Sequence, residues 1–171
     1  QFNNKYSQNK IQAANGILAL SEEELQKSPM RFLVSGWAFY PDALLTPEEI
    51  RDENHYMRYL STGEQTNFSS PANPSPYGCG TYQMTFFLPE RKETYALEIP
   101  EVFSAYNLYL DHDLILQMGE PAQGTPLVQN RMVTFHGGKP VTLTIAVSNY
   151  DHFYGGIVYP PAFGTMLAVN T

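Results

Sequence analysis

The residues best suited to chemistry lie in one segment, residues 148–161, which reads SNYDHFYGGIVYPP. It combines aromatic rings with a histidine, an amide and a carboxylate around two glycines. Flat amphipathic rings beside fixed hydrogen-bonding groups suit a sugar or another polar ring, whose apolar face stacks while its hydroxyls are bonded. We therefore predict a ligand site that includes Asn149, His152, Tyr154 and Tyr159. In the alternative interpretation, Asn149 and His152 satisfy backbone groups where a long loop crosses the end of a β-sandwich.

Three residues outside this segment are further candidates. Trp37 or Tyr40, in the run SGWAFYP, can offer an aromatic face to a ligand. A lone tryptophan is more often a core anchor, because burying its large surface stabilises the fold. Arg131 stands out in an acid-rich chain, and its guanidinium can fork onto a ligand or onto a carboxylate such as Glu101. The ion pair is the more common arrangement for such an arginine.

Other kinds of site find little support. The four histidines, at positions 55, 112, 136 and 152, lack the spacing of a compact zinc site, so we expect no metal or cofactor. Asp111 and Asp113 could ligate calcium, but aspartates in this setting usually form a hairpin turn. The single cysteine, Cys79, excludes an intrachain disulfide and has no neighbouring basic group to activate it.

The sequence also argues against catalysis. It has no Gly-rich phosphate loop and no GxSxG nucleophile elbow. Hydrolysis of a glycan would need two carboxylates about 5 to 10 Å apart across a cleft, which spacing alone does not place. We expect a protein that is not an enzyme.

Charge and composition narrow the partners. The chain has 171 residues and a net charge of −7, with no run of basic residues, which argues against nucleic acid. Hydrophobic residues make up 43% and charged residues only 16%, as in a folded domain. This length suits one domain. We expect a leader or short N-terminal segment over residues 1–16 and a single domain over 17–171.

The elements that position these residues are mainly strands. From residue 80 onward, six short runs of strand-forming residues are separated by turn residues: 81–89, 94–100, 105–111, 114–119, 130–136 and 140–149. Alternation along 141–147 predicts that one face is buried. Ser21 with three glutamates after it, and the run Thr46-Pro47-Glu48-Glu49, resemble capped helix starts. We predict an all-β, antiparallel β-sandwich of jelly-roll type with one or two short helices in the N-terminal third.

Several stretches resemble a known family. The runs SGWAFYPDALLTPEE, EIPEVFSAYNLYLDHDLILQMG and VSNYDHFYGGIVYPPAFGT are similar to the extracellular sensor domain of bacterial seven-transmembrane receptors with diverse intracellular signalling modules. The resemblance covers about residues 17–165. It implies a galactose-binding-like jelly roll on the extracellular or periplasmic face of the cytoplasmic membrane. The parent chain would be anchored by a seven-helix region that is absent from this sequence.

These observations lead to one expected function and one alternative. We expect an extracytoplasmic ligand-sensing domain that binds a carbohydrate or another small polar ligand without catalysis. The alternative is a protein–protein interaction module, a homodimer or a partner-binding domain, whose tyrosines form the contact patch.

Overall fold

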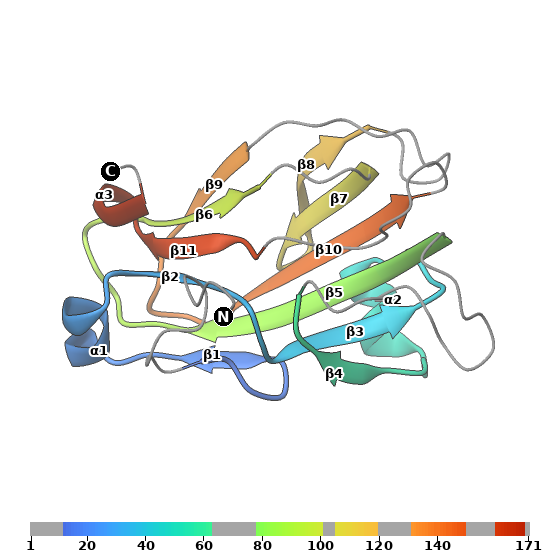
Figure 1. Ribbon diagram of the computed structural model, residues 1–171, viewed down its shortest axis with the longest axis horizontal. Coiled ribbons are helices and arrows are strands. Elements are labelled where there is room, and N and C mark those ends of the chain that lie inside the picture. Colours follow the sequence, from blue (N-terminus) through green and yellow to red (C-terminus); the bar gives the residue numbers. More distant parts are fainter. Residues whose placement is uncertain (1–11, 63–77, 101–104, 120–130, 150–159, 170–171) are drawn as a thin grey trace, which may run out of the picture.

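The computed structural model describes residues 12–62, 78–100, 105–119, 131–149 and 160–169, and within them the chain forms two packed β-sheets (Figure 1). The larger sheet has the order β4 (Arg58–Leu60), β3 (Trp37–Pro41), β5 (Gly78–Phe87), β10 (Val141–Asn149), β7 (Ala105–Leu110) and β8 (Asp113–Met118), with β1 (Ile17–Ala19) beside β5. The smaller sheet has the order β2 (Met30–Phe32), β11 (Ala162–Thr165), β6 (Tyr95–Ile99) and β9 (Arg131–Phe135). All pairings are antiparallel except β1 with β5. The predicted antiparallel β-sandwich, with two short helices in the N-terminal third, is confirmed.

Aromatic rings join the two sheets. Phe163 of β11 stacks on Phe86 of β5 with ring centroids 5.1 Å apart, and on Tyr95 of β6 at 5.8 Å. Phe135 of β9 completes this four-ring cluster. Buried aromatic surface therefore holds the sheets together. Removing apolar surface from water is the main favourable contribution to the free energy of folding.

Three short helices accompany the described strands: α1 (Glu22–Lys27), α2 (Pro47–Asp52) and α3 (Met166–Val169). The two predicted helix starts are confirmed, and each is a capping box. The Ser21 hydroxyl accepts from the Glu24 N–H while the Glu24 carboxylate accepts from the Ser21 N–H. The same exchange links Thr46 and Glu49. The sequence analysis did not anticipate α3.

The six predicted strands after residue 80 are confirmed as β5 to β10. Strands β2 and β3 lie close together in the sequence but belong to different sheets, β2 to the smaller and β3 to the larger. The break between them contains Gly36, whose φ of +82° is a conformation that other residues rarely adopt. A Cβ atom there would lie 2.3 Å from the Ala13 carbonyl oxygen, so only glycine fits this crossing.

The outward face of β10 is more covered than its alternation suggested. Thr144 and Ser148, on the predicted polar face, are both fully buried. On the adjoining strand, the Thr81 hydroxyl accepts from the Leu45 N–H at 2.9 Å and donates to the Ala43 carbonyl at 2.8 Å. These bonds tie the segment that leads into α2 to the outward face of the larger sheet.

The hairpin between β7 and β8 forms as predicted at Asp111. Leu110 pairs with Asp113, and Asp111 adopts a φ of 53°, which aspartate tolerates. The Asp111 carboxylate accepts from the Thr142 N–H at 2.9 Å, so it serves the turn. None of the helices in the described part of the chain is long and apolar enough to span a membrane.

Candidate functional site

Several of the described strands begin or end at the same rim of the sandwich. At this rim, Asn149 at the end of β10 pairs with Gly78 at the start of β5, and Ile99 at the end of β6 pairs with Arg131 at the start of β9. The same rim holds the end of β8 and the start of β7, since Tyr106 pairs with Met118 there. Strand β10 ends at Asn149, so residues 150–159 come next in the sequence.

Arg131 and Tyr106 meet at this rim. The Arg131 Nε donates to the Met118 Sδ at 3.3 Å, which connects the smaller sheet to the larger one. Tyr106, directly across the ladder from Met118, is only 1% exposed. Burial raises the pKa of Tyr106 to about 12, while the positive charge of Arg131 acts in the opposite direction.

The hydrogen bonding of the Tyr106 hydroxyl also bears on the site. It is buried and has no hydrogen-bond partner among the described residues. A buried hydroxyl without a partner costs about 1–3 kcal/mol, so such groups are rare and call for an explanation. A ligand oxygen at the rim would supply the missing partner.

The structure places the predicted site residues in different parts of the molecule. Trp37 is fully buried, and its indole N–H donates to the Leu33 carbonyl at 2.9 Å. It offers no face to a ligand here, which corrects its assignment as a ligand platform and agrees with the core-anchor interpretation. Tyr40 is half-buried on β3, with its ring edge-on to His55 at 6.2 Å. Burial raises the pKa of Tyr40.

The remaining predicted residues relate directly to the rim. Arg131 and the backbone of Asn149 lie on strand ends at this rim. His152, Tyr154 and Tyr159 fall outside the described residues, as does Glu101, the suggested ion-pair partner of Arg131. The role of residues 150–159 as a ligand site therefore stays a prediction.

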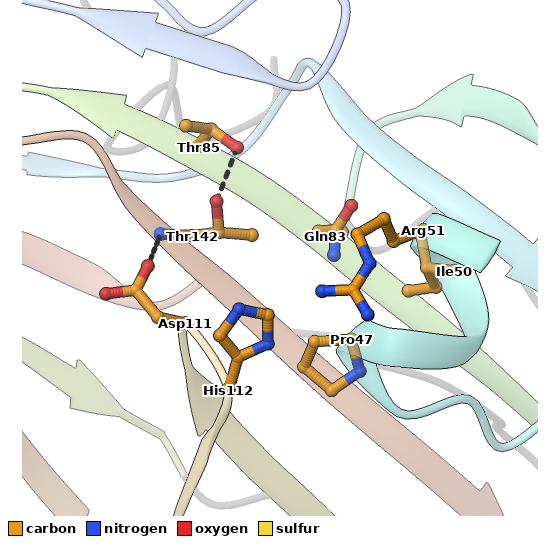
Figure 2. Close-up of a pocket in the computed structure, with 8 residues that line it drawn as sticks. All are labelled: Pro47, Ile50, Arg51, Gln83, Thr85, Asp111, His112 and Thr142. Carbon is orange, nitrogen blue, oxygen red and sulfur yellow. Dashed lines mark hydrogen bonds between the residues drawn. The ribbon is translucent and has the colours of Figure 1, made fainter.

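A second candidate site is a groove on the outward face of the larger sheet, which Figure 2 shows. Its cavity volume is about 510 Å³, within the range of small-molecule sites. Three kinds of element form it: the sheet, helix α2 and the β7–β8 hairpin. The residues that line it are Pro47, Ile50, Arg51, Gln83, Thr85, Asp111, His112 and Thr142.

Polar pairs hold the sides of this groove. Thr85 and Thr142 share a hydrogen bond of 3.0 Å between their hydroxyls on the floor. His112 Nδ1 lies 2.8 Å from a carboxylate oxygen of Glu48, which links the hairpin to α2. The backbone N–H of Glu48 and the His112 ring hold the pKa of the Glu48 carboxyl below its usual value.

The sequence analysis missed this groove. A signal was present, because Gln83 and Thr85 alternate with buried residues along β5, as Thr142 and Thr144 do along β10. Two neighbouring strands with polar outward positions indicate a sheet face that meets water or a ligand. Which helix and hairpin flank that face depends on tertiary packing.

Among the described residues, no cluster of three or more metal-ligating side chains is found.

Comparisons with known proteins agree with the fold. No family model matches the sequence, and no curated protein is similar to it. Among solved structures, similar ones include a β-glucuronidase of Faecalibacterium prausnitzii (TM-score 0.58, 16% identity) and β-glucuronidase 3 of Bacteroides uniformis in its apo form (0.61, 11%). A GH2 β-galacturonidase of Eisenbergiella tayi, solved bound to galacturonate, is also similar (0.55, 14%).

These matches concern one portion of much longer proteins. They cover 81%, 81% and 79% of this chain but only 32%, 22% and 24% of the respective enzymes. At such identities the likeness shows the fold alone. The chain is a β-sandwich domain that resembles part of the GH2 glycosidases.

Proposed function

We propose that this chain is the extracytoplasmic ligand-sensing domain of a bacterial membrane receptor, and that it binds a carbohydrate or another small polar ligand at the rim where β10 ends. The observation that carries the binding site is the buried hydroxyl of Tyr106, which has no hydrogen-bond partner among the described residues and lies near the charge of Arg131. Both groups are hydrogen-bond donors, and they lie at the rim from which the aromatic segment 150–159 departs.

Two further points support the proposal. The sequence resembles the sensor domains of seven-helix receptors over about residues 17–165, and the fold resembles sandwich portions of sugar-processing enzymes. The proposal does not include catalysis. Near the groove, the Asp111 carboxylate accepts a hydrogen bond from the Thr142 N–H, and the Glu48 carboxylate is hydrogen-bonded to His112.

Sensing requires more than binding. A ligand shifts a receptor only when it binds one conformation better than the other, by about 1–3 kcal/mol for ordinary coupling. Strand ends from both sheets meet at the rim, where Arg131 of β9 contacts Met118 of β8. A ligand that contacts Tyr106 and Arg131 would therefore be sensitive to how the two sheets are placed.

A thermal-shift screen against mono- and oligosaccharides and amino acids tests the proposal. A ligand at about 100 times its Kd stabilises the folded state by about 2.7 kcal/mol, which raises Tm by several degrees. We expect Tyr154→Ala and His152→Ala to abolish the shift. The matched control is Tyr56→Ala, because Tyr56 is an exposed tyrosine outside the segment.

A hit that survives both substitutions, or a bound ligand remote from the rim, would contradict the site. The exposed rings of Tyr56 and Tyr59 favour the interaction module as the second candidate function. A screen with no hit, together with concentration-dependent dimers in sedimentation, would favour that alternative.

A further inference from the structure

We propose that the groove between α2 and the β7–β8 hairpin is a second binding site, and that it takes a neutral pyranose sugar. The groove is distinct from the rim. Thr142, on its floor, lies seven residues along β10 from Asn149, which at about 3.3 Å per residue is roughly 23 Å. The inference therefore does not depend on the rim site.

The free hydrogen-bonding groups of the groove include both donors and acceptors. Gln83 Nε2 donates to the Thr144 hydroxyl at 3.0 Å, which leaves its second N–H and its carbonyl oxygen without a partner among the described residues. Because a carboxylate accepts only, His112 Nδ1 donates to Glu48, and its Nε2 has no partner among the described residues. A sugar hydroxyl both donates and accepts, so this mixed set suits a polyol.

Arg51 adds a directed donor above the floor. Its Nε and Nη2 bind the Asp52 carboxylate at 2.8 and 3.1 Å, so the guanidinium is held in one orientation. Its Nη1 has no partner among the described residues. Figure 2 shows Arg51 extending from α2 on the side opposite His112, with Gln83 on β5 next to Arg51. A ring placed between them can bond on more than one edge.

One side of the groove is apolar. The ring of Pro47 and the side chain of Ile50 line it from α2. A pyranose carries C–H groups on its ring face and hydroxyls around its edge, so it matches an apolar side above a polar floor. No aromatic platform lines the groove, and we therefore expect a Kd of roughly millimolar order.

Charge selects a neutral sugar over an acidic one. Asp111 lines the groove, and the carboxylates of Asp52 and Glu48 bind its lining residues Arg51 and His112. The permanent positive charge of Arg51 is already paired with Asp52. A uronate would add a further negative charge to a site where carboxylates outnumber cations, and like charges at short range repel.

The test is a titration of the 15N-labelled chain, followed by NMR, with glucose, galactose and glucuronate up to about 100 mM, well above a millimolar Kd. We expect glucose or galactose to shift the backbone amides of Thr85, Thr142 and His112, and glucuronate to bind at least about fivefold more weakly. Gln83→Ala should weaken neutral-sugar binding about tenfold or more. Gln117→Ala is the matched control, because Gln117 is an exposed strand glutamine outside the groove.

Arg51→Ala is a second variant, at a side chain of α2 that is 58% exposed, and should weaken binding severalfold. The inference is overturned if no groove amide moves at the highest sugar concentration, or if Gln83→Ala and Gln117→Ala bind alike. Equal binding of glucuronate would overturn the choice of a neutral ligand. Shifts confined to rim residues such as Arg131 would support the rim site and overturn this one, so the two proposals fail separately.

Discussion

Individual side chains in this protein serve either the core or the surface sites, and burial decides which. Trp37 has the residue type of a ligand platform, yet its indole N–H donates to the Leu33 carbonyl inside the sandwich. Arg31 is a charged residue that is only 2% exposed, and burial lowers the pKa of its guanidinium. Its Nη2 donates to the carbonyl of Ser28, at the end of α1. Residue type alone did not distinguish these roles.

The raised pKa of Tyr106 predicts how stability changes with pH. Its pKa of about 12 in the folded protein exceeds the ordinary value of 10.0, so above pH 10 the unfolded chain loses this proton first. Stability should therefore fall as pH rises from about 10 to 12, by roughly 1.4 kcal/mol per unit for this group. Tyr106→Phe has no such proton, and it also removes a hydroxyl that has no partner among the described residues.

Urea unfolding at pH 8 and pH 11 measures this effect. We expect Tyr106→Phe to be at least as stable as the parent at pH 8 and to lose less stability at pH 11. Burial also raises the pKa values of Tyr40, Tyr95 and Tyr109, but they titrate in both proteins, so the difference isolates Tyr106. An equal loss in both would contradict the assignment.

Single helices and turns position the groove. Helix α2 is only six residues long, and helices of this length depend on caps and tertiary contacts. Its capping box at Thr46 and the bonds from Thr81 to the preceding segment hold it on the sheet. The β7–β8 hairpin is held in turn by Asp111, which binds the Thr142 N–H.

The caps give a matched pair of variants. Thr46→Ala and Ser21→Ala each remove one capping hydroxyl, so each should lower the free energy of unfolding by about 1 kcal/mol. Only Thr46→Ala should also weaken sugar binding in the groove, because only α2 lines it. Chemical denaturation and the NMR titration report the two effects. Equal sugar binding by both variants would show that α2 does not shape the site.

At the scale of the whole molecule, the aromatic cluster that joins the sheets determines stability. Phe163 contacts Phe86, Tyr95 and Phe135 and is fully buried. Rings from both sheets take part, so the cluster supports the relative placement of the two layers.

Removing this ring tests the role of the cluster. We expect Phe163→Ala to lower the free energy of unfolding by about 3–5 kcal/mol and Phe163→Leu by less, because a smaller cavity remains. Phe87→Ala should change it by about 0.5 kcal/mol or less, since Phe87 is 44% exposed. Urea denaturation measures all three. If Phe163→Ala is unfolded, Phe163→Leu should still lose more stability than Phe87→Ala.

Most element types follow from local sequence patterns. Alternation identified β5 to β10, and Ser21 and Thr46 marked both N-terminal helices, because these signals depend on side chains within a few residues of each other. It also singled out Arg131 and Asn149, which the structure places on the same rim. Short strands such as β1 and β4 lack enough residues to show a period and were missed.

Which residues meet in space depends on how distant segments pack against each other. The groove brings together α2, β5, β10 and the hairpin, which are far apart in the chain. The break at Gly36 depends on a close approach to Ala13. The Tyr106 hydroxyl, which has no partner in the described part of the chain, owes this to burial between two sheets. These features arise from packing between distant segments, which local pattern does not encode.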